Sequence, residues 1–245
     1  MFPISSALAQ TGATYSDAAR LTWALVTRLG EAQILLPAML AALLWLVLAA
    51  RALPVALWWL AGTAAAAVLT TVTKVAFFGF EIGYAPLDYT GISGHAMFAA
   101  AVIPMLAGLL AGGATPRWRR GAVVAGYALA ALIAYSRIKV GAHSSFEALT
   151  GFILGSLASA LPLNAQHLPD MRAPAWLAAG LALWMLSLPL GAPPSLTHGW
   201  VVRLSLAVSD RATPYSRHAM HRDYQRELKR RQGPQLSAQA ALRWQ

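Results

Sequence analysis

The chain has 245 residues, of which 58% are hydrophobic and only 11% are charged. Soluble domains carry about 25% charged residues, so this composition excludes an ordinary water-solvated globule and indicates an integral membrane protein. The sequence contains no cysteine, which excludes disulfides and thiolate metal sites. The formal net charge of +10 fits loops beside anionic lipid, or a site for an anionic substrate, and we expect no nucleic-acid partner.

Six apolar stretches follow one another along the chain. They cover residues 32–50, 52–73, 96–113, 121–135, 144–163 and 174–190. A helix needs about 20 apolar residues to cross the hydrocarbon core, so the fourth stretch is short and we expect its helix to extend into its neighbours. No stretch alternates as a barrel strand does. The pattern predicts an all-α membrane bundle of about six transmembrane helices.

Two other segments flank the predicted transmembrane domain of residues 32–191. In residues 1–31, apolar side chains recur at helical spacing, which predicts an amphipathic segment at the membrane interface. Residues 192–245 form a basic, polar tail, for which we expect a solvated or headgroup-associated helix. Several histidines lack a charged partner at a useful spacing, and no chemistry is assigned to them: His167, His198, His218 and His221.

The few ionisable residues that interrupt the apolar region form two clusters. The cluster between the second and third stretches contains Lys74, Glu81, Asp88 and His95. The cluster between the fourth and fifth contains Arg137, Lys139, His143 and Glu147. A charge at the bilayer centre costs on the order of 3 kcal/mol, so such residues are functional candidates. Because successive helices alternate in direction, we expect both clusters, and hence the active site, at one membrane face.

The second cluster pairs a histidine with an acid. His143 and Glu147 are four residues apart, so they lie on one face of a helix that begins near Ala142. Glu147 can then hold one imidazole nitrogen and leave the other free as a nucleophile. Arg137 offers a planar fork that matches phosphate oxygens, and Lys139 adds a point charge. This pattern indicates nucleophilic chemistry on an anionic group.

The first cluster ends in Ser93, Gly94 and His95, immediately before an apolar run. Ser93 is suited to cap that helix, and Gly94 lets backbone amides approach an anion at the helix start. His95 would then lie in the first turn, placed for proton transfer. Lys74, at the end of the second stretch, would point a cation at the same pocket. Glu81 and Asp88 are interpreted as loop acids.

The second cluster resembles the third signature motif of the type 2 phosphatidic acid phosphatase superfamily. Ser136 and Arg137 are followed by five residues, His143, three residues and the acid Glu147. This motif is specific, because its residue types stand at fixed spacing. The resemblance as a whole spans roughly residues 74–155, with compatible membrane helices around it.

The first cluster resembles the family's other two motifs. Ser93-Gly94-His95 is similar to the second motif, and Lys74 to the lysine that opens the first. Three positions depart from the family pattern: Ile92 stands where it has proline, Glu147 where it has aspartate, and Glu81 where it has an arginine seven residues after the lysine. The missing arginine leaves two alternatives open, replacement by another cation, Lys139, or weakened activity.

The resemblance implies a mechanism that needs no metal and no cofactor. His143 would attack the phosphorus and form a phosphohistidine, Glu147 would orient His143, and His95 would protonate the leaving oxygen. The residues expected to bind the phosphate are Lys74, Ser93, Gly94, Arg137, Ser136 and Lys139. The protein would therefore be a membrane phosphatase acting on a phosphomonoester or diphosphate of a lipid. Alternatives are a lipid phosphotransferase of the same family and a non-catalytic lipid-phosphate binder or transporter.

Orientation is predicted from the short loops. The loop that holds Arg117, Arg119 and Arg120 is expected in the cytoplasm, which places the active site on the opposite, periplasmic face of the inner membrane. The basic tail would then also lie outside, against a simple count of Lys and Arg. Long flanking segments can cross despite their charge, so the short loop decides.

Overall fold

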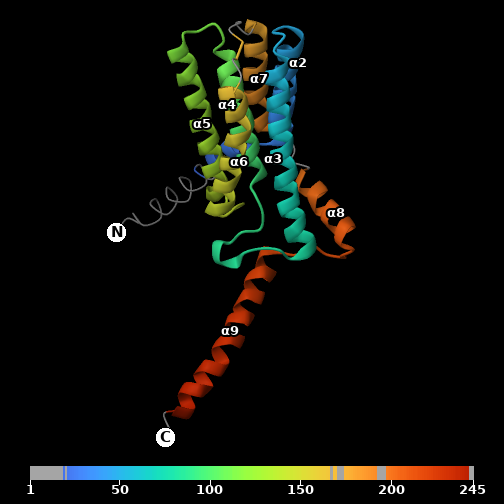
Figure 1. The fold of residues 1–245 in the computed structure, drawn as a ribbon, viewed down its shortest axis with the longest axis vertical. Coiled ribbons are helices and arrows are strands. Elements are labelled where there is room, and N and C mark those ends of the chain that lie inside the picture. The colour runs from blue at the N-terminus through green and yellow to red at the C-terminus, as the bar shows by residue number, and fades with distance from the viewer. Residues whose placement is uncertain (1–18, 20, 166–167, 170–173, 192–196, 243–245) are drawn as a thin grey trace, which may run out of the picture.

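The computed structural model describes residues 19, 21–165, 168–169, 174–191 and 197–242 (Figure 1). This part of the chain is helical and contains no β-strand. Its helices are α2 (Ala32–Leu48), α3 (Leu53–Phe80), α4 (Gly94–Leu110), α5 (Pro116–Lys139), α6 (Ser145–Ala165), α7 (Ala175–Gly191), α8 (Thr197–Ser209) and α9 (Arg217–Leu242). A short 3-10 helix, η1 (Ala85–Leu87), lies between α3 and α4, and a further helical stretch covers residues 21–28.

The bundle has the dimensions and the surface of a membrane protein. Four described helices are long and apolar enough to cross a bilayer: Leu21–Leu48, Leu53–Phe80, Pro116–Lys139 and Ser145–Asn164. Their outer faces expose large apolar side chains such as Leu44, Leu57 and Leu157, as lipid contact requires. A helical membrane bundle is thereby confirmed. Two further apolar helices, Gly94–Leu110 and Ala175–Trp184, are shorter, so six crossings stay a prediction.

Two predicted boundaries move in the structure. The second helix does not end at Lys74 but continues to Phe80, because the residues beyond Lys74 are apolar and carry the helix on. The fourth helix does extend on both sides of its predicted stretch, to Pro116–Lys139.

The predicted interfacial segment of residues 1–31 is described only in part, since residues 1–18 and 20 lie outside the described residues. The helical stretch 21–28 leads directly into α2, and Trp23 packs edge-on against Tyr135 of α5. Arg28 and Glu31, which precede the first apolar stretch, pair with each other at 3.7 Å. This stretch is therefore part of the bundle and not a separate surface segment.

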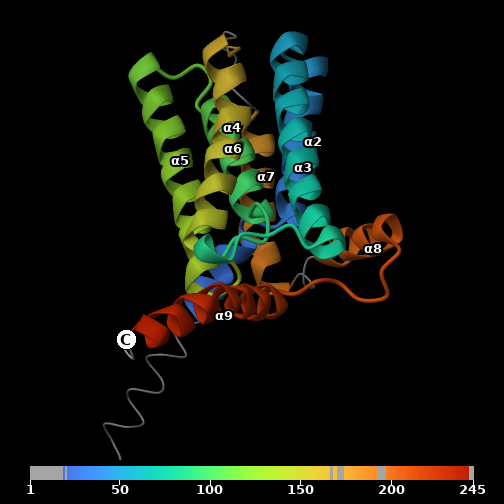
Figure 2. The same cartoon turned by 60° about the horizontal axis from the view of Figure 1, so that its bottom comes forward.

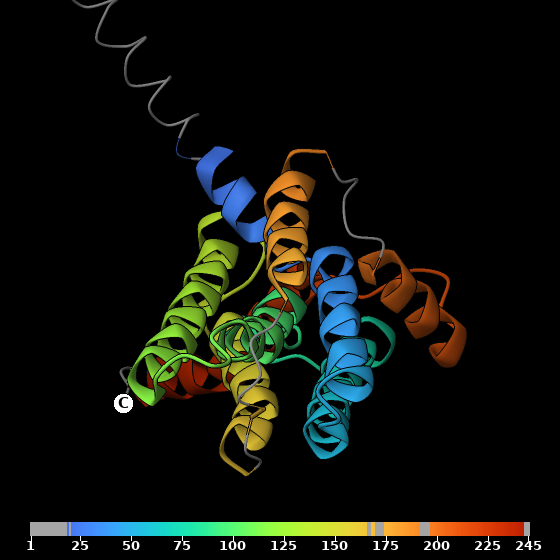
Figure 3. The ribbon, with the colours of Figure 1, turned by 90° about the horizontal axis from the view of Figure 1, so that it is seen from above.

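Helix α4 lies in the middle of the bundle, with α2, α3, α5 and α6 around it (Figure 3). Most of its side chains are buried, which is the expected fate of a helix that is apolar on every side. Seen from above, the other helices shield α4 from the surroundings on most sides. The surrounding helices therefore fix the position of the first turn of α4, which carries His95.

Glycines let α6 approach α4 at backbone contact distance. A Cβ added at Gly151 would lie 2.5 Å from the carbonyl oxygen of Ser93, and one at Gly155 would lie 2.1 Å from that of Met97. Small residues four apart are the usual means by which membrane helices bring their backbones together. The contact also brings the two helix starts together, since the Ser93 amide donates to the Glu147 carbonyl at 3.1 Å.

A proline inside α4 creates a second link to α6. Pro104 has no N–H, so the carbonyl of Ala100 loses its usual helical partner. The Ser159 hydroxyl donates to this carbonyl at 2.7 Å and lies 2.9 Å from the hydroxyl of Tyr127 on α5. In lipid, an unsatisfied carbonyl costs several kcal/mol, so this bond stabilises the three-helix contact.

Both charged clusters lie at the same end of the bundle, where α3 and α5 end and α4 and α6 begin. Helix α8 packs beside α3 at this end, and α9 begins there and extends away from the bundle (Figures 1 and 2). The basic loop before and within the start of α5 lies at the opposite end. The two clusters thus lie at one end of the bundle, as the alternation of helix direction predicts.

We expect Gly151→Ala and Gly155→Ala to destabilise the protein, because either methyl group would collide with a backbone carbonyl of α4. Overpacking of this kind typically costs about 1–3 kcal/mol. The thermal unfolding midpoint of the detergent-solubilised protein measures the effect. Gly180→Ala on α7 is the matched control, since its added Cβ meets no atom within 4 Å. Equal midpoints for Gly155→Ala and Gly180→Ala would contradict the close α4–α6 contact.

Candidate active site

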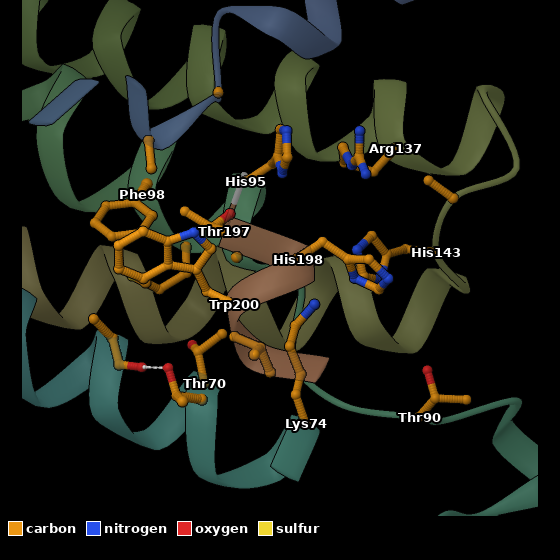
Figure 4. Close-up of a pocket in the computed structure, with 18 of the residues that line it drawn as sticks. Thr70, Lys74, Thr90, His95, Phe98, Arg137, His143, Thr197, His198 and Trp200 are labelled. Atoms are coloured by element: carbon orange, nitrogen blue, oxygen red, sulfur yellow. Dashed lines mark hydrogen bonds between the residues drawn. The ribbon is translucent and has the colours of Figure 1, made fainter. Parts of the chain in front are cut away.

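A cavity of about 930 Å³ lies where the two charged clusters meet. Its polar end is formed by Lys74, His95, Arg137, His143 and Arg217. Apolar side chains of α4 and α8 also line the cavity: Met97, Phe98, Trp200, Val201 and Leu204. Figure 4 shows Phe98 and Trp200 at the end of the cavity opposite His143. The cavity therefore offers cations at one end and a hydrocarbon surface at the other.

The structure brings four of the predicted site residues to this cavity from four different segments. Lys74 comes from α3, His95 from the first turn of α4, Arg137 from the last turn of α5 and His143 from the loop before α6. In Figure 4, His95 and Arg137 approach from one side and Lys74 from the other. Gly94, at the start of α4, also lines the cavity. Residues that are distant in sequence thus face one volume.

His143 is held by Glu147. The Nδ1 atom of His143 lies 2.7 Å from Oε2 of Glu147, whose side chain is completely buried. The amide and the hydroxyl of Thr90 both donate to Oε1 at 2.6 Å. The Ser144 amide donates to Oε2 at 3.2 Å. With Nδ1 donating to this fixed carboxylate, the other ring nitrogen, Nε2, keeps its lone pair.

The surroundings of His143 favour its neutral form. Burial lowers the pKa of His143 below its usual value of 6.5, and the hydrogen bond to Glu147 opposes this only in part. The nearby cations Lys74 and Arg137 lower the pKa of His143 further. A neutral imidazole at pH 7 is the form that can act as a nucleophile.

Arg137 lines the cavity and has a hydrogen-bond donor without a partner among the described residues. Its Nη1 donates to the Thr27 hydroxyl at 2.9 Å. Its Nε is buried and has no hydrogen-bond partner in the described parts of the chain. Buried donors are nearly always satisfied, so an unpaired one beside a cavity suits an anionic ligand. Gly30 packs closely against His95, since a Cβ added at Gly30 would lie 3.3 Å from the Cβ of His95.

Three predicted phosphate-binding residues do not line the cavity. Ser136 is buried, and its hydroxyl donates to the Ile133 carbonyl at 2.6 Å. Lys139 is exposed and lies over the Tyr135 ring, with Nζ 5.0 Å from the ring centroid. Ser93 is completely buried at the α4–α6 contact. Lys139 therefore does not replace, at the cavity, the arginine that the resembled family has at the position of Glu81.

The basic tail contributes a residue that sequence reasoning missed. Arg217, the first residue of α9, lines the cavity, and its Nη2 donates to Glu147 Oε2 at 2.8 Å. Its Nη1 pairs with the carboxylate of Asp88, which also lies 2.6 Å from Nε2 of His221. The expectation of a merely solvated or headgroup-associated tail is thus wrong for these residues, since ion pairs fasten the start of α9 to the site. Arg217 and Glu147 are 70 residues apart, so no local spacing signals the pair.

Two further differences concern residues around the cavity. His198 of α8, to which no chemistry was assigned, lines the cavity. Glu81, which stands where the resembled family has an arginine, does not line it and pairs with Arg211 at 2.6 Å. His167 lies outside the described residues. The carboxylate at position 81 therefore does not place a negative charge on the cavity wall.

Comparison with known proteins gives one informative match. The chain is 32% identical over 206 residues to an uncharacterized 22.5 kDa protein in the cps region of Klebsiella pneumoniae. The match covers 82% of this chain and 99% of that protein. This chain belongs to the same family. No protein-family model matches the chain, and no solved structure does. The match shows kinship with this uncharacterized protein.

We expect the NMR titration of His143 to have its midpoint below 6.5, because burial and two cations favour the neutral ring. Glu147→Gln removes the negative charge that stabilises the imidazolium, so the midpoint should fall further, by about one pH unit or more. His143→Gln assigns the signal in protein labelled with ¹⁵N-histidine.

Glu227→Gln is the control for this titration, since Glu227 pairs with Arg231 at 2.8 Å on an exposed part of α9. It should leave the midpoint of His143 where the unmodified protein has it. A midpoint above 6.5 in the unmodified protein, or no response to Glu147→Gln, would contradict the described environment of His143.

Proposed function

We propose that this protein is an integral membrane phosphatase that removes phosphate from a lipid phosphomonoester or diphosphate through a phosphohistidine at His143. The observation that carries the proposal is the His143–Glu147 pair, at 2.7 Å, whose histidine lines a cavity together with two further histidines and three cations. The resemblance of these residues to the type 2 phosphatidic acid phosphatase motifs supports the same reaction.

The geometry supports a two-step displacement. In the first step Nε2 of His143 attacks the phosphorus, the bond to the leaving oxygen breaks, and the protonated ring of His95 gives that oxygen its proton and becomes neutral. In the second step His95 takes a proton from water, whose oxygen attacks the phosphohistidine and releases inorganic phosphate and neutral His143. Phosphoryl transfer needs positioning and stabilisation of the equatorial oxygens, which Lys74, Arg137 and the start of α4 would supply.

The two ends of the cavity favour a lipid substrate. A phosphate at the cationic end would leave its hydrocarbon chain along the apolar end, beside Phe98 and Trp200. A small hydrophilic phosphate would place the same negative charge beside the cations but would leave the apolar part of the cavity unoccupied. Phosphatidic acid, phosphatidylglycerophosphate, polyprenyl diphosphates and lipid A phosphates all share the required chemistry. A lipid alcohol in place of water would make the protein a phosphotransferase.

We further propose six membrane crossings in the inner membrane, with the cavity on the periplasmic face. The short apolar helix α4 is enclosed by its neighbours, so it can complete a crossing with little lipid contact of its own. The basic residues 117–120 lie at the end of the bundle opposite the cavity. Short basic loops remain in the cytoplasm, which favours the proposed orientation.

The orientation is tested with a single cysteine in place of Ala114, at the end opposite the cavity. We expect this cysteine to resist a membrane-impermeant maleimide in intact cells and to react after the membrane is permeabilised. A cysteine in place of Gln225, on the α9 side, is the control and should react in intact cells. Labelling of the Ala114→Cys variant from outside would reverse the orientation.

Activity is tested by phosphate release from a panel of lipid phosphates in mixed micelles. His143→Ala should lower kcat by a factor of about a thousand or more, because it removes the nucleophile. His218→Ala is the matched control, since His218 is an exposed histidine on α9. Folded protein that binds these lipids yet releases no phosphate from any of them would make it a binder or transporter.

The same assay separates the role of His95. His95→Ala should slow phosphohistidine formation by about 10²–10⁴-fold for a poor leaving group and much less for a nitrophenolate. A uniform loss across leaving groups would exclude the acid role.

A further inference from the structure

One oxygen of Glu147 is shared between the reactive histidine and the tail. His143 Nδ1 lies 2.7 Å from Oε2, and Arg217 Nη2 donates to the same oxygen at 2.8 Å. Within the described residues, Arg217 is the one Lys or Arg side chain in hydrogen-bond contact with Glu147. Because Glu147 is completely buried, a contact with a cation greatly reduces the cost of keeping it ionised.

The same guanidinium group also fixes the loop that holds the other oxygen of Glu147. Arg217 Nη1 pairs with the Asp88 carboxylate and donates to the Asp88 carbonyl at 3.1 Å. Arg217 Nη2 lies 3.3 Å from the Thr90 hydroxyl. Thr90 in turn donates both its amide and its hydroxyl to Oε1 at 2.6 Å. Arg217 therefore acts on one oxygen of Glu147 directly and on the other through the loop.

We infer that Arg217 is a positioning residue of the active site, which holds Glu147 in the orientation that directs His143, and that the start of α9 is thereby part of the catalytic unit. This inference rests on the proposed function for its kinetic consequence. The geometry itself, a planar fork that spans two carboxylates, is suited to arginine and not to lysine.

A pH readout distinguishes this role from a merely structural one. The charged and titratable side chains around His143 come from six segments: Lys74 on α3, His95 on α4, Arg137 on α5, Glu147 on α6, His198 on α8 and Arg217 on α9. Loss of Arg217 leaves the charge of Glu147 less compensated and removes a cation near the ring. Both changes favour the imidazolium, so the titration midpoint of His143 should rise, opposite to the effect of Glu147→Gln.

The experiment compares Arg217→Gln, Arg217→Lys and Arg211→Gln in the full-length protein in detergent micelles. Arg211→Gln is the matched control, because it breaks another bridge between the tail and α3, at 2.6 Å from Glu81, away from Glu147. We measure the ¹⁵N-histidine titration of His143 and the pH profile of kcat/KM. Arg217→Gln should raise the midpoint and the acid limb together and lower kcat/KM by about 10–100-fold, as loss of a supporting hydrogen bond typically does.

Arg217→Lys should keep the midpoint near that of the unmodified protein, since the charge remains, while kcat/KM falls because the fork is lost. Values for Arg217→Gln that match Arg211→Gln in both measurements would overturn the inference. If Arg217→Gln does not fold, unchanged kcat/KM in Arg217→Lys overturns it instead. If the unmodified protein releases no phosphate from any lipid, the proposed function fails, and the titration alone still decides the role of Arg217.

Discussion

The contact between the backbones of α4 and α6 is the constraint on which the site depends. Helices in lipid gain little from the hydrophobic effect when they associate, so close packing and hydrogen bonds must hold them together. Gly151 and Gly155 provide the close packing, and the bond from the Ser93 amide to the Glu147 carbonyl fixes the register of the two helix starts. His95 follows Ser93 at the start of α4, and His143 precedes α6. One packing contact therefore sets how both histidines face the cavity.

The helical fold, the shared end of the two clusters and the His143–Glu147 pair could be predicted, because they depend on local spacing. Apolar runs of sufficient length predict membrane helices wherever they stand, and the alternation of helix direction places both charged clusters at one end. The pairing of His143 with Glu147 follows from a spacing of four residues at a helix start. These relations need no knowledge of how the helices pack.

The prediction for Lys139 failed for a geometric reason. Arg137 and Lys139 lie two residues apart on α5, which turns the second side chain roughly 200° around the helix from the first. When Arg137 faces the cavity, Lys139 must face outward, where it contacts Tyr135. The sequence prediction gave an apolar stretch of residues 121–135 and did not say how far the helix continues beyond it, so the rotation did not enter the prediction. The role of Arg217 was not predicted for a different reason: its contact with Glu147 joins positions 70 residues apart.

The cavity contains a cation, Lys74, that is in hydrogen-bond contact with no carboxylate of the described residues. Lys74, Arg137 and Arg217 come from three elements. Arg217 pairs with Glu147 and Asp88, and Glu31 lies near Arg137. Glu147 is already shared by His143 and Arg217, so it cannot fully compensate the other cations. An anion bound beside Lys74 and Arg137 would reduce the repulsion between these two cations. This part of the cavity therefore favours an anionic ligand.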